Sequence, residues 1–131
     1  MSDKKETNPL NQYAAASSRS GCPIASALDL VGDRWTLVLI RDLLNGKTRF
    51  SEFLSSPEQI SASVLIVRLK ALEASALVEK NPYQLRPKRF EYSLTESGRH
   101  LAPVLQAMCT WSNKFIKDTW VPPLAFMDYE P

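Results

Sequence analysis

The chain has 131 residues, 44% of them apolar and 23% charged, with a formal net charge of +2 from 16 basic and 14 acidic side chains. This length accommodates one domain, and the apolar content is enough to bury a core. The longest apolar runs have four residues, far short of the roughly 20 that a membrane-spanning helix needs, and no apolar stretch follows Lys4 and Lys5 as it would in a secretory signal. We therefore expect a soluble, cytoplasmic protein without a membrane partner.

The residue types that most enzyme and metal sites need are few and scattered. Cys22 and Cys109 lie far apart and form no C-x-x-C pair, and His100 is the single histidine, so neither a redox dithiol nor a His/Cys metal site is expected. Four isolated glycines cannot build a Gly-rich phosphate loop. The sequence therefore predicts a protein that is not an enzyme and carries no cofactor or metal.

Helical periodicity begins at Pro23, and Cys22 is the expected N-cap because proline is favoured at the first position of a helix. Gly32 ends this helix, and Asp33 is expected to cap a second one that ends at Asn45–Gly46. A short third helix follows. Apolar residues at helical spacing predict the buried faces of these three helices: Ile24, Ala27, Leu28 and Val31; Trp35, Val38, Leu39, Leu43 and Leu44; and Phe50, Phe53 and Leu54.

A fourth helix is predicted after the cap residue Ser61, because leucines recur at helical spacing along one stripe: Leu65, Leu69 and Leu72. When that stripe faces the core, the opposite side of the helix is left to meet a partner. The residues on that side are Ser63, Ile66, Val67 and Lys70. Arg68 lies closer to the core side.

The helical period gives way to a strand period after residue 76. Residues 77–80 predict a first strand and residues 81–87 a loop. A second strand is expected from Lys88 onward, where apolar Phe90, Tyr92 and Leu94 alternate with polar residues. This region carries a cluster of basic residues without an intervening acid: Lys80, Arg86, Lys88 and Arg89.

Thr95 is expected to cap a final helix over residues 96–119, kinked by Pro103 in its second turn. Its apolar band, about 35 Å long at 1.5 Å per residue, is more than so small a domain covers alone. An apolar tail over residues 120–131 follows, and residues 1–20 predict a flexible N-terminal arm. We therefore expect the domain to occupy residues 21–119 and its last helix to need a partner.

This order of elements is typical of a winged helix-turn-helix, a mainly α fold with a small β-hairpin (α+β). In this fold the fourth helix enters the DNA major groove, and the loop between the strands, the wing, reaches the neighbouring backbone. Residues 33–100 carry 11 basic and 8 acidic side chains, so the positive surplus lies where phosphates would be. We expect double-stranded DNA as a partner, contacted by Arg49, Ser61, Ser63, Ile66, Val67, Arg68, Lys70, Arg86, Lys88 and Arg89.

The chemistry of these residues divides their expected roles. Serine hydroxyls and backbone amides bond phosphates or base edges, whereas Ile66 and Val67 can recognise only thymine methyls or DNA shape. Arg68 either braces the domain or reaches a phosphate, and Arg49 either contacts the DNA backbone or is simply solvated.

Several segments, taken together and in order over about residues 22–115, resemble the HxlR family of bacterial, MarR-like winged-helix transcriptional regulators. They are Cys22-Pro23, Leu28-Asp29-Leu30-Val31-Gly32-Asp33-Arg34-Trp35, Arg49-Phe50-Ser51-Glu52, Ile60-Ser61, Arg68-Leu69-Lys70-Ala71-Leu72-Glu73, Leu77-Val78, Glu91-Tyr92-Ser93-Leu94-Thr95-Glu96-Ser97-Gly98-Arg99 and Cys109-Thr110-Trp111. The chain departs from the family at Ser75-Ala76, where a glycine is usual, so a weaker C-terminal turn is expected after the fourth helix.

The resemblance implies a homodimer on a palindromic operator, with the first and last helices at the dimer interface. Two recognition helices would then lie about 34 Å apart, the spacing of successive major grooves. The apolar residues expected at this interface are Leu28, Leu105, Met108, Trp111 and Phe115. The sequence does not divide those of the last helix between interface and core.

Many members of the family use the cysteine equivalent to Cys22 to sense oxidants or electrophiles, so the resemblance implies a small oxidant or electrophile as effector. A helix N-terminus favours the thiolate, and Arg19 is close in sequence. The alternative is that Cys22 is a small, half-buried cap. Cys109 is expected to pack in the apolar band, and an inter-subunit disulfide between Cys22 and Cys109 is compatible with the family pattern.

Two other functions compete with DNA binding. The apolar run Val64-Leu65-Ile66-Val67 would also suit a winged-helix module that binds a partner protein. A thiol-dependent enzyme is a more distant alternative, because no base or resolving cysteine stands at a recognisable spacing from Cys22.

Overall fold

The computed structural model describes residues 19–131, so the predicted flexible arm lies almost wholly outside the described residues. Nine elements follow one another along the described chain: α3 (Pro23–Val31), α4 (Thr36–Leu44), α5 (Phe50–Leu54), α6 (Ala62–Ala74), β1 (Val78–Leu85), β2 (Lys88–Leu94), α7 (Glu96–Arg99), α8 (Ala102–Phe115) and α9 (Leu124–Met127). This is the predicted α+β winged helix-turn-helix. No helix in this part of the chain has the length and apolar character needed to cross a membrane.

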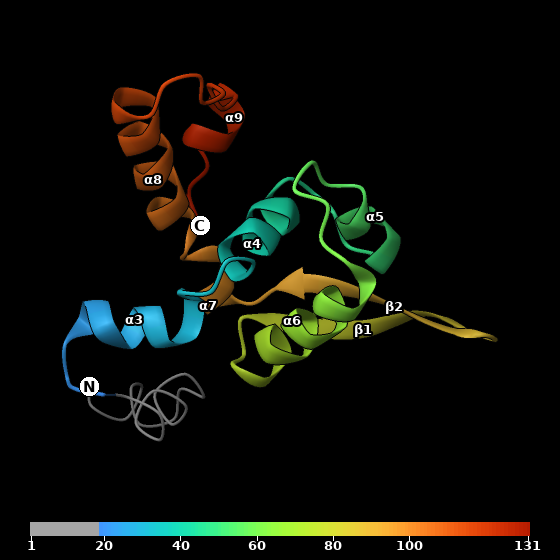
Figure 1. Cartoon of the computed structure of the whole chain (residues 1–131). Helices are drawn as coiled ribbons and strands as arrows, with labels where there is room; N and C mark the ends of the chain where they lie inside the picture. The colour runs from blue at the N-terminus through green and yellow to red at the C-terminus, as the bar shows by residue number, and fades with distance from the viewer. Residues whose placement is uncertain (1–18) are drawn as a thin grey trace.

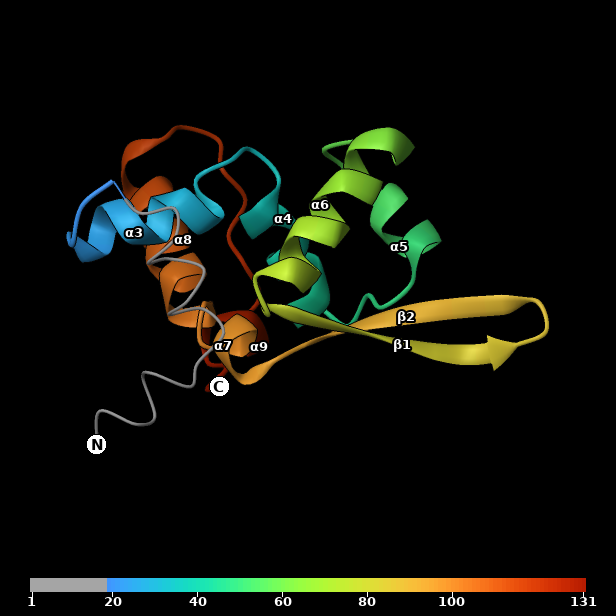
Figure 2. The same ribbon diagram turned by 90° about the horizontal axis from the view of Figure 1, so that it is seen from below.

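The helix-turn-helix and the hairpin form one end of the molecule, and α3 and α8 form the other (Figure 1 and Figure 2). The antiparallel hairpin of β1 and β2 projects away from the helices as a long wing. α6 runs beside the base of this hairpin, and α4 lies between the two ends of the molecule.

The core forms where α4, α5 and α6 meet the base of the hairpin. The leucine stripe of α6 is buried as predicted, and it packs with Phe53 of α5 and Ile40 of α4 in one cluster.

Two of the four predicted caps form as predicted. Ser61 accepts a hydrogen bond from the Val64 amide, and Thr95 accepts one from the Gly98 amide. By contrast, Cys22 occupies the N-cap of α3 without a side-chain hydrogen bond. Asp33 lies two residues before the N-cap of α4, Trp35, and accepts from the Trp35 and Thr36 amides.

The prediction of a loop over residues 81–87 is wrong, because β1 continues to Leu85 and only Arg86 and Pro87 form the turn. Both strands of a two-stranded sheet are edge strands, where a proline is tolerated, so Pro82 does not end β1. The register shifts between Pro82 and Gln84, which leaves Tyr83 as the extra residue of a bulge.

The prediction of one kinked helix over residues 96–119 is also wrong. The chain turns at His100 and Leu101, and Pro103 lies in the first turn of the new helix α8, where its missing amide costs no hydrogen bond. α8 ends at Phe115, and the apolar tail folds back through α9, with Phe126 packed against the core.

Two backbone positions fix the junction between α6, the wing and α7. Ala76 adopts a left-handed conformation with φ of 60°, so the turn that the family makes with glycine is present here without one. Gly98 brings α7 against the start of the hairpin, because a Cβ at this position would lie 2.2 Å from the Leu77 carbonyl oxygen.

Candidate nucleic-acid interface

The outer face of α6 is exposed in the way the sequence predicts. Ile66 is 46% exposed and Val67 is 54% exposed, and Ser63 and Lys70 are exposed as well. The Ser61 hydroxyl lies 3.4 Å from that of Ser63 at the start of the helix. The helix therefore offers polar groups at its first turn and an apolar strip beyond it, a surface that suits phosphates, base edges and thymine methyl groups.

Arg68 is tied to the domain by an ion pair. Its Nη1 atom lies 3.4 Å from Oδ2 of Asp33, at the start of α4. Although burial tends to raise the pKa of Asp33, hydrogen bonds from the Thr36 side chain and from the Trp35 and Thr36 amides, together with the Arg68 charge, hold this pKa below its usual value. Of the two roles predicted for Arg68, the structure shows the bracing role, which fixes α6 against α4.

Arg49 is held against the wing and is not merely solvated. Its guanidinium carbon lies 3.8 Å from the centroid of the Tyr83 ring, a cation–π distance. Its backbone amide donates to Glu52 at 2.9 Å, and hydrogen bonds from the Thr48 and Arg49 amides lower the pKa of Glu52. This arrangement joins the start of α5 to the middle of β1.

The wing combines exposed cations with aromatic rings. Arg86, Lys88 and Arg89 are all exposed at or near its tip. Lys80 and Lys88 both approach the Phe90 ring, with Nζ atoms 4.3 Å and 5.4 Å from its centroid. The ring restricts the two lysines on one side of the hairpin, so the positive charge is held in place along the wing.

Sequence reasoning missed Tyr83 and Phe90 as parts of this surface, and it counted Lys80 in the basic cluster without placing it among the DNA contacts. Tyr83 could not be placed because its segment was predicted to be a loop, whereas the bulge turns its ring toward Arg49. Phe90 was predicted only as an apolar member of the alternating second strand, and it lies half-buried beneath two lysines. The alternation of aromatic and basic residues along the hairpin was the available signal.

The residues predicted for the dimer interface are mostly exposed. Trp111 is 58% and Phe115 is 64% exposed, and Leu28 and Met108 are also more than half exposed. Leu105 is the exception, because it is only 6% exposed and belongs to the core of its own chain. The prediction for Leu105 is therefore corrected: it lies on the inner face of α8, whereas Trp111 and Phe115 lie on the outer face. Ile24, which was predicted on the buried face of the first helix, is instead 72% exposed, and together with Val104 it extends the exposed apolar surface.

The two thiols are free and differ in exposure. Cys22 is the N-cap of α3, as predicted, and it is exposed, not half-buried, whereas Cys109 is half-buried on α8. Arg19, expected near Cys22 from the sequence, donates from Nε to Oδ1 of Asp29 at 3.0 Å. The Arg19 guanidinium is therefore paired with a carboxylate of α3, the helix that Cys22 caps.

Comparison with known proteins places this geometry in a family. The model of the HxlR-like helix-turn-helix family matches residues 30–119. The HTH-type transcriptional regulator YybR of Bacillus subtilis strain 168 is 34% identical over 122 residues, which cover 92% of this chain and 91% of YybR.

Solved structures agree with this match. The structure of the transcription factor PA1607 matches with a TM-score of 0.71 and 32% identity, and the match covers 80% of this chain and 74% of the PA1607 chain. The redox regulator HypR in its oxidised form matches with a TM-score of 0.65 and 36% identity, and the match covers 71% of this chain and 96% of the HypR chain.

The exposed face of α6, the basic wing and these similarities agree with one another. They favour DNA binding over the protein-interaction module and over a thiol-dependent enzyme. The chain belongs to the HxlR-like helix-turn-helix family of DNA-binding transcriptional regulators.

Proposed function

We propose that the protein regulates transcription as a homodimer bound to a palindromic operator. The observation that carries this proposal is the exposed apolar surface of α3 and α8, which lies at the end of the molecule opposite the wing tip (Figure 1 and Figure 2). A monomer would leave Leu28, Met108, Trp111 and Phe115 in water, and this many exposed large apolar side chains at one end of a molecule favour a protein interface there. A two-fold axis at this end would leave both wings free for DNA.

Within each half-site the proposed contacts divide by chemistry. Ser61, Ser63 and Lys70 on α6 bond phosphates or base edges, while Ile66 and Val67 contact thymine methyls. Arg86, Lys88 and Arg89 neutralise backbone phosphates from the wing. Arg49 does so from the start of α5. Arg68 supports these contacts by fixing α6 to Asp33.

Dimerisation is tested by measuring mass in solution, free and on operator DNA. We expect two chains per particle and two chains per duplex. Trp111→Glu places a charge in the proposed interface, so it should give a monomer that binds the operator at least tenfold more weakly. Lys117→Glu, an exposed change beyond α8, is the control. A wild-type protein that is monomeric both free and on DNA contradicts the proposal.

A second proposed element is thiol sensing at Cys22, with a small oxidant or electrophile as effector. Its support is the exposure of Cys22 at the start of α3, one of the two proposed interface helices, and the likeness to HypR, which is a redox regulator. A modified thiol there would disturb the packing of α3 against the second copy.

Sensing is tested by comparing operator affinity before and after treatment with diamide or benzoquinone. We expect a change of at least fivefold in the wild type and in Cys109→Ser, and none in Cys22→Ser. An equal response of the wild type and Cys22→Ser removes Cys22 from the mechanism. A response lost in Cys109→Ser as well would indicate the Cys22–Cys109 pair.

A further inference from the structure

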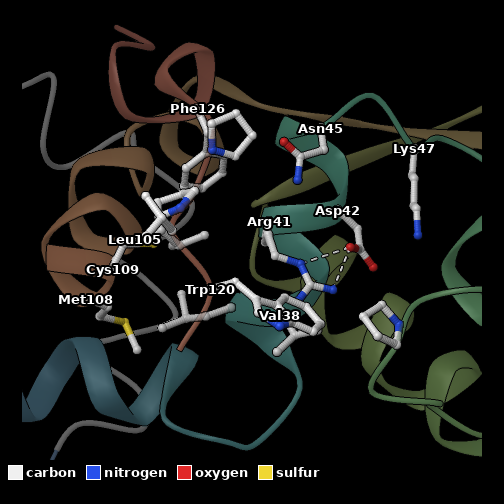
Figure 3. Close-up of a pocket in the computed structure, with 15 residues that line it drawn as sticks. Val38, Arg41, Asp42, Asn45, Lys47, Leu105, Met108, Cys109, Trp120 and Phe126 are labelled. Carbon is white, nitrogen blue, oxygen red and sulfur yellow. Dashed lines mark hydrogen bonds and ion pairs between the residues drawn. The ribbon is translucent and has the colours of Figure 1, made fainter. Parts of the chain in front are cut away.

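A pocket of about 540 Å³ lies between α4, α8 and the C-terminal tail (Figure 3). Its apolar walls include Val38 of α4, Leu105 of α8, and Trp120 and Phe126 of the tail. This volume is in the range of pockets that hold small organic ligands. The rings of Trp120 and Phe126 offer flat apolar surfaces against which another aromatic ring can pack.

The end of this pocket at α4 is polar, with Arg41, Asn45 and Lys47 in its lining beside the Asp42 carboxylate, which is paired with Arg41. The Arg41 guanidinium has five N–H groups, and four of them donate to Asp42 and Glu58. Within the part of the chain that the structure describes, the remaining N–H on Nη1 and the side-chain amide of Asn45 have no hydrogen-bond partner. These donors at the edge of an apolar space suit a ligand that brings an acceptor oxygen.

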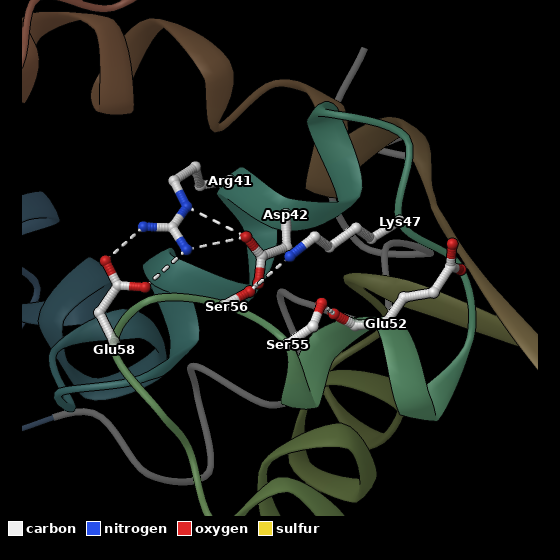
Figure 4. Close-up of polar contacts among 7 residues, drawn as sticks. All are labelled: Arg41, Asp42, Lys47, Glu52, Ser55, Ser56 and Glu58. Atoms are coloured by element: carbon white, nitrogen blue, oxygen red, sulfur yellow. Dashed lines mark hydrogen bonds and ion pairs between the residues drawn. The ribbon is translucent and has the colours of Figure 1, made fainter.

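The same arginine also holds the turn that precedes the recognition helix (Figure 4). Arg41 makes two hydrogen bonds to Glu58, at 2.7 Å and 2.8 Å, and it also bonds Asp42. The buried Asp42 accepts a hydrogen bond of 2.5 Å from Ser56, which in turn accepts one from Lys47 at 2.7 Å. Glu58 and Ser56 lie in the turn between α5 and α6, so the polar end of the pocket is connected directly to the helix-turn-helix.

The pocket and the proposed dimer surface lie largely on different sides of α8 and meet at Met108, which lines both. Leu105 and Cys109, four residues apart, share the side that lines the pocket. Val104 and Trp111, seven residues apart, share the outer side. A second copy of the chain on the outer side therefore leaves the inner side to a smaller occupant.

We propose that this pocket binds a planar aromatic molecule bearing a carbonyl or carboxylate oxygen, and that its occupancy changes DNA affinity through Arg41 and the turn that holds Glu58. The aromatic part packs between Trp120 and Phe126, and the oxygen accepts hydrogen bonds from Asn45 and Arg41. The effect on DNA affinity rests on the proposed function, whereas binding to the pocket does not.

Binding is tested on the full-length protein, without DNA, by titrating 2-naphthoate and following the Trp120 indole N–H signal by NMR. We expect a saturable shift, with affinity at least tenfold weaker for 2-methylnaphthalene, which lacks the oxygen. Asn45→Asp removes a donor and adds a negative charge, so it should weaken 2-naphthoate binding at least tenfold. The matched change Asn81→Asp, on the wing, should leave binding unchanged. No saturable shift, or equal affinity for the two probes, overturns the site.

The effect on DNA is tested by measuring operator affinity with and without saturating 2-naphthoate. We expect a change of at least fivefold in the wild type, within the usual range of allosteric coupling. Glu58→Gln keeps the pocket lining and removes the negative charge paired with Arg41, so it should bind the probe at least as tightly as the wild type and yet change its DNA affinity less than twofold. An unchanged wild-type affinity overturns the coupling. A protein that shows no operator preference even without the probe would instead contradict the proposed function, and the NMR titration would still decide the site.

Discussion

The guanidinium carbon of Arg49 lies 3.8 Å from the centroid of the Tyr83 ring, which joins the start of α5 to the bulge in β1. The base of the wing is held by the core as well, through the Tyr92 amide, which donates to the Thr48 carbonyl at 2.7 Å, and through the Phe53–Tyr92 ring contact, whereas the Arg49–Tyr83 contact lies farther out along the hairpin. Because the wing and α6 must meet DNA together, the Arg49–Tyr83 contact helps to hold the outer part of the wing in position beside the helices.

Removing the ring of Tyr83 should weaken operator binding without unfolding the protein. We expect Tyr83→Ala to reduce affinity about two- to fivefold, in line with about 0.5–1 kcal/mol for an exposed cation–π contact. Tyr83→Phe keeps the ring and should keep the affinity. Affinity measured by fluorescence anisotropy checks this, with the melting temperature as a control for folding. Equal losses in the two variants would show that the hydroxyl, and not the ring, matters.

Wing and helix substitutions should differ in their dependence on DNA sequence. Lys88→Ala and Arg89→Ala remove phosphate contacts, so they should weaken binding to operator and random DNA alike and lower the salt dependence by about one counterion each. Ile66→Ala should instead lower the preference for operator over random DNA and leave the salt dependence unchanged. Salt titrations on both duplexes test this, and a loss of preference in Lys88→Ala would contradict it.

Ala76→Gly should stabilise the fold. Ala76 has a φ of 60°, a conformation that is strained for a residue with a Cβ and free of strain for glycine. We expect a gain of about 1 kcal/mol in the free energy of unfolding, measured with urea. Ala71→Gly, at an exposed position inside α6, should instead lose about the same amount. A lower stability for Ala76→Gly would show that the greater freedom of glycine in the unfolded chain outweighs the strain.

Gly98→Ala should destabilise the fold. The added Cβ would lie 2.2 Å from the Leu77 carbonyl oxygen, which is backbone and moves only with the hairpin. We expect a loss of about 1–3 kcal/mol, as for other overpacked sites. Gly21→Ala is the matched control, because nothing lies within 4 Å of a Cβ at that position. Similar melting temperatures for Gly98→Ala and wild type would contradict the close approach of α7 to β1.

Stability should fall in acid, and Glu58 should account for part of the loss. Hydrogen bonds from Arg41 lower the pKa of Glu58, and the contacts of Asp33 lower its pKa against the effect of burial. A carboxylate whose pKa is lower in the folded than in the unfolded protein stabilises the fold at every pH above its pKa in the unfolded chain. That pKa is 4.5 for Glu58 and 3.8 for Asp33. The contribution is lost as the pH falls to the pKa of the folded state.

The melting temperature, recorded between pH 7 and pH 3, tests this dependence. It should change little down to about pH 5 and then drop. Glu58→Gln should cost less than about 1 kcal/mol at pH 7, because the pair is partly exposed, and its curve should be flatter in acid. Glu79→Gln, on the exposed side of β1, should follow the wild type. A Glu58→Gln curve parallel to that of the wild type would exclude this contribution.

The fold was predictable wherever local chemistry and burial agree. The stripe of Leu65, Leu69 and Leu72 indicated the core side of α6, and Ser61 indicated its start. Both predictions held because the N-cap residue is followed directly by apolar residues at helical spacing. The exposures of Trp111 and Phe115 followed from an apolar band too wide for one domain.

The errors arose where tertiary pairing overrides local signals. Pro82 indicated a loop but lies within an edge strand, where a missing amide is tolerated. Pro103 indicated a kink, but a proline fits equally well in the first turn of a new helix, and the sequence does not distinguish the two. Leu105 shares the band of Trp111, and only the packing of α8 against α4 shows that it faces inward.

The polar pocket end could not be predicted from the sequence. Arg41, Asp42 and Glu58 appear as ordinary charges along two segments, and only the fold brings them together at 2.7–2.8 Å. The same holds for Arg49 and Tyr83, which come from α5 and from a bulge that has no clear local signature.

The central claim, a dimer on a palindromic operator, is tested most directly by selecting bound sequences from random duplex DNA at fixed salt. The account predicts enrichment of an inverted repeat whose half-site centres lie about 10 base pairs or a multiple apart, bound by two chains per duplex. Enrichment of a single unrepeated half-site bound by one chain, or no enrichment over random DNA, would contradict it.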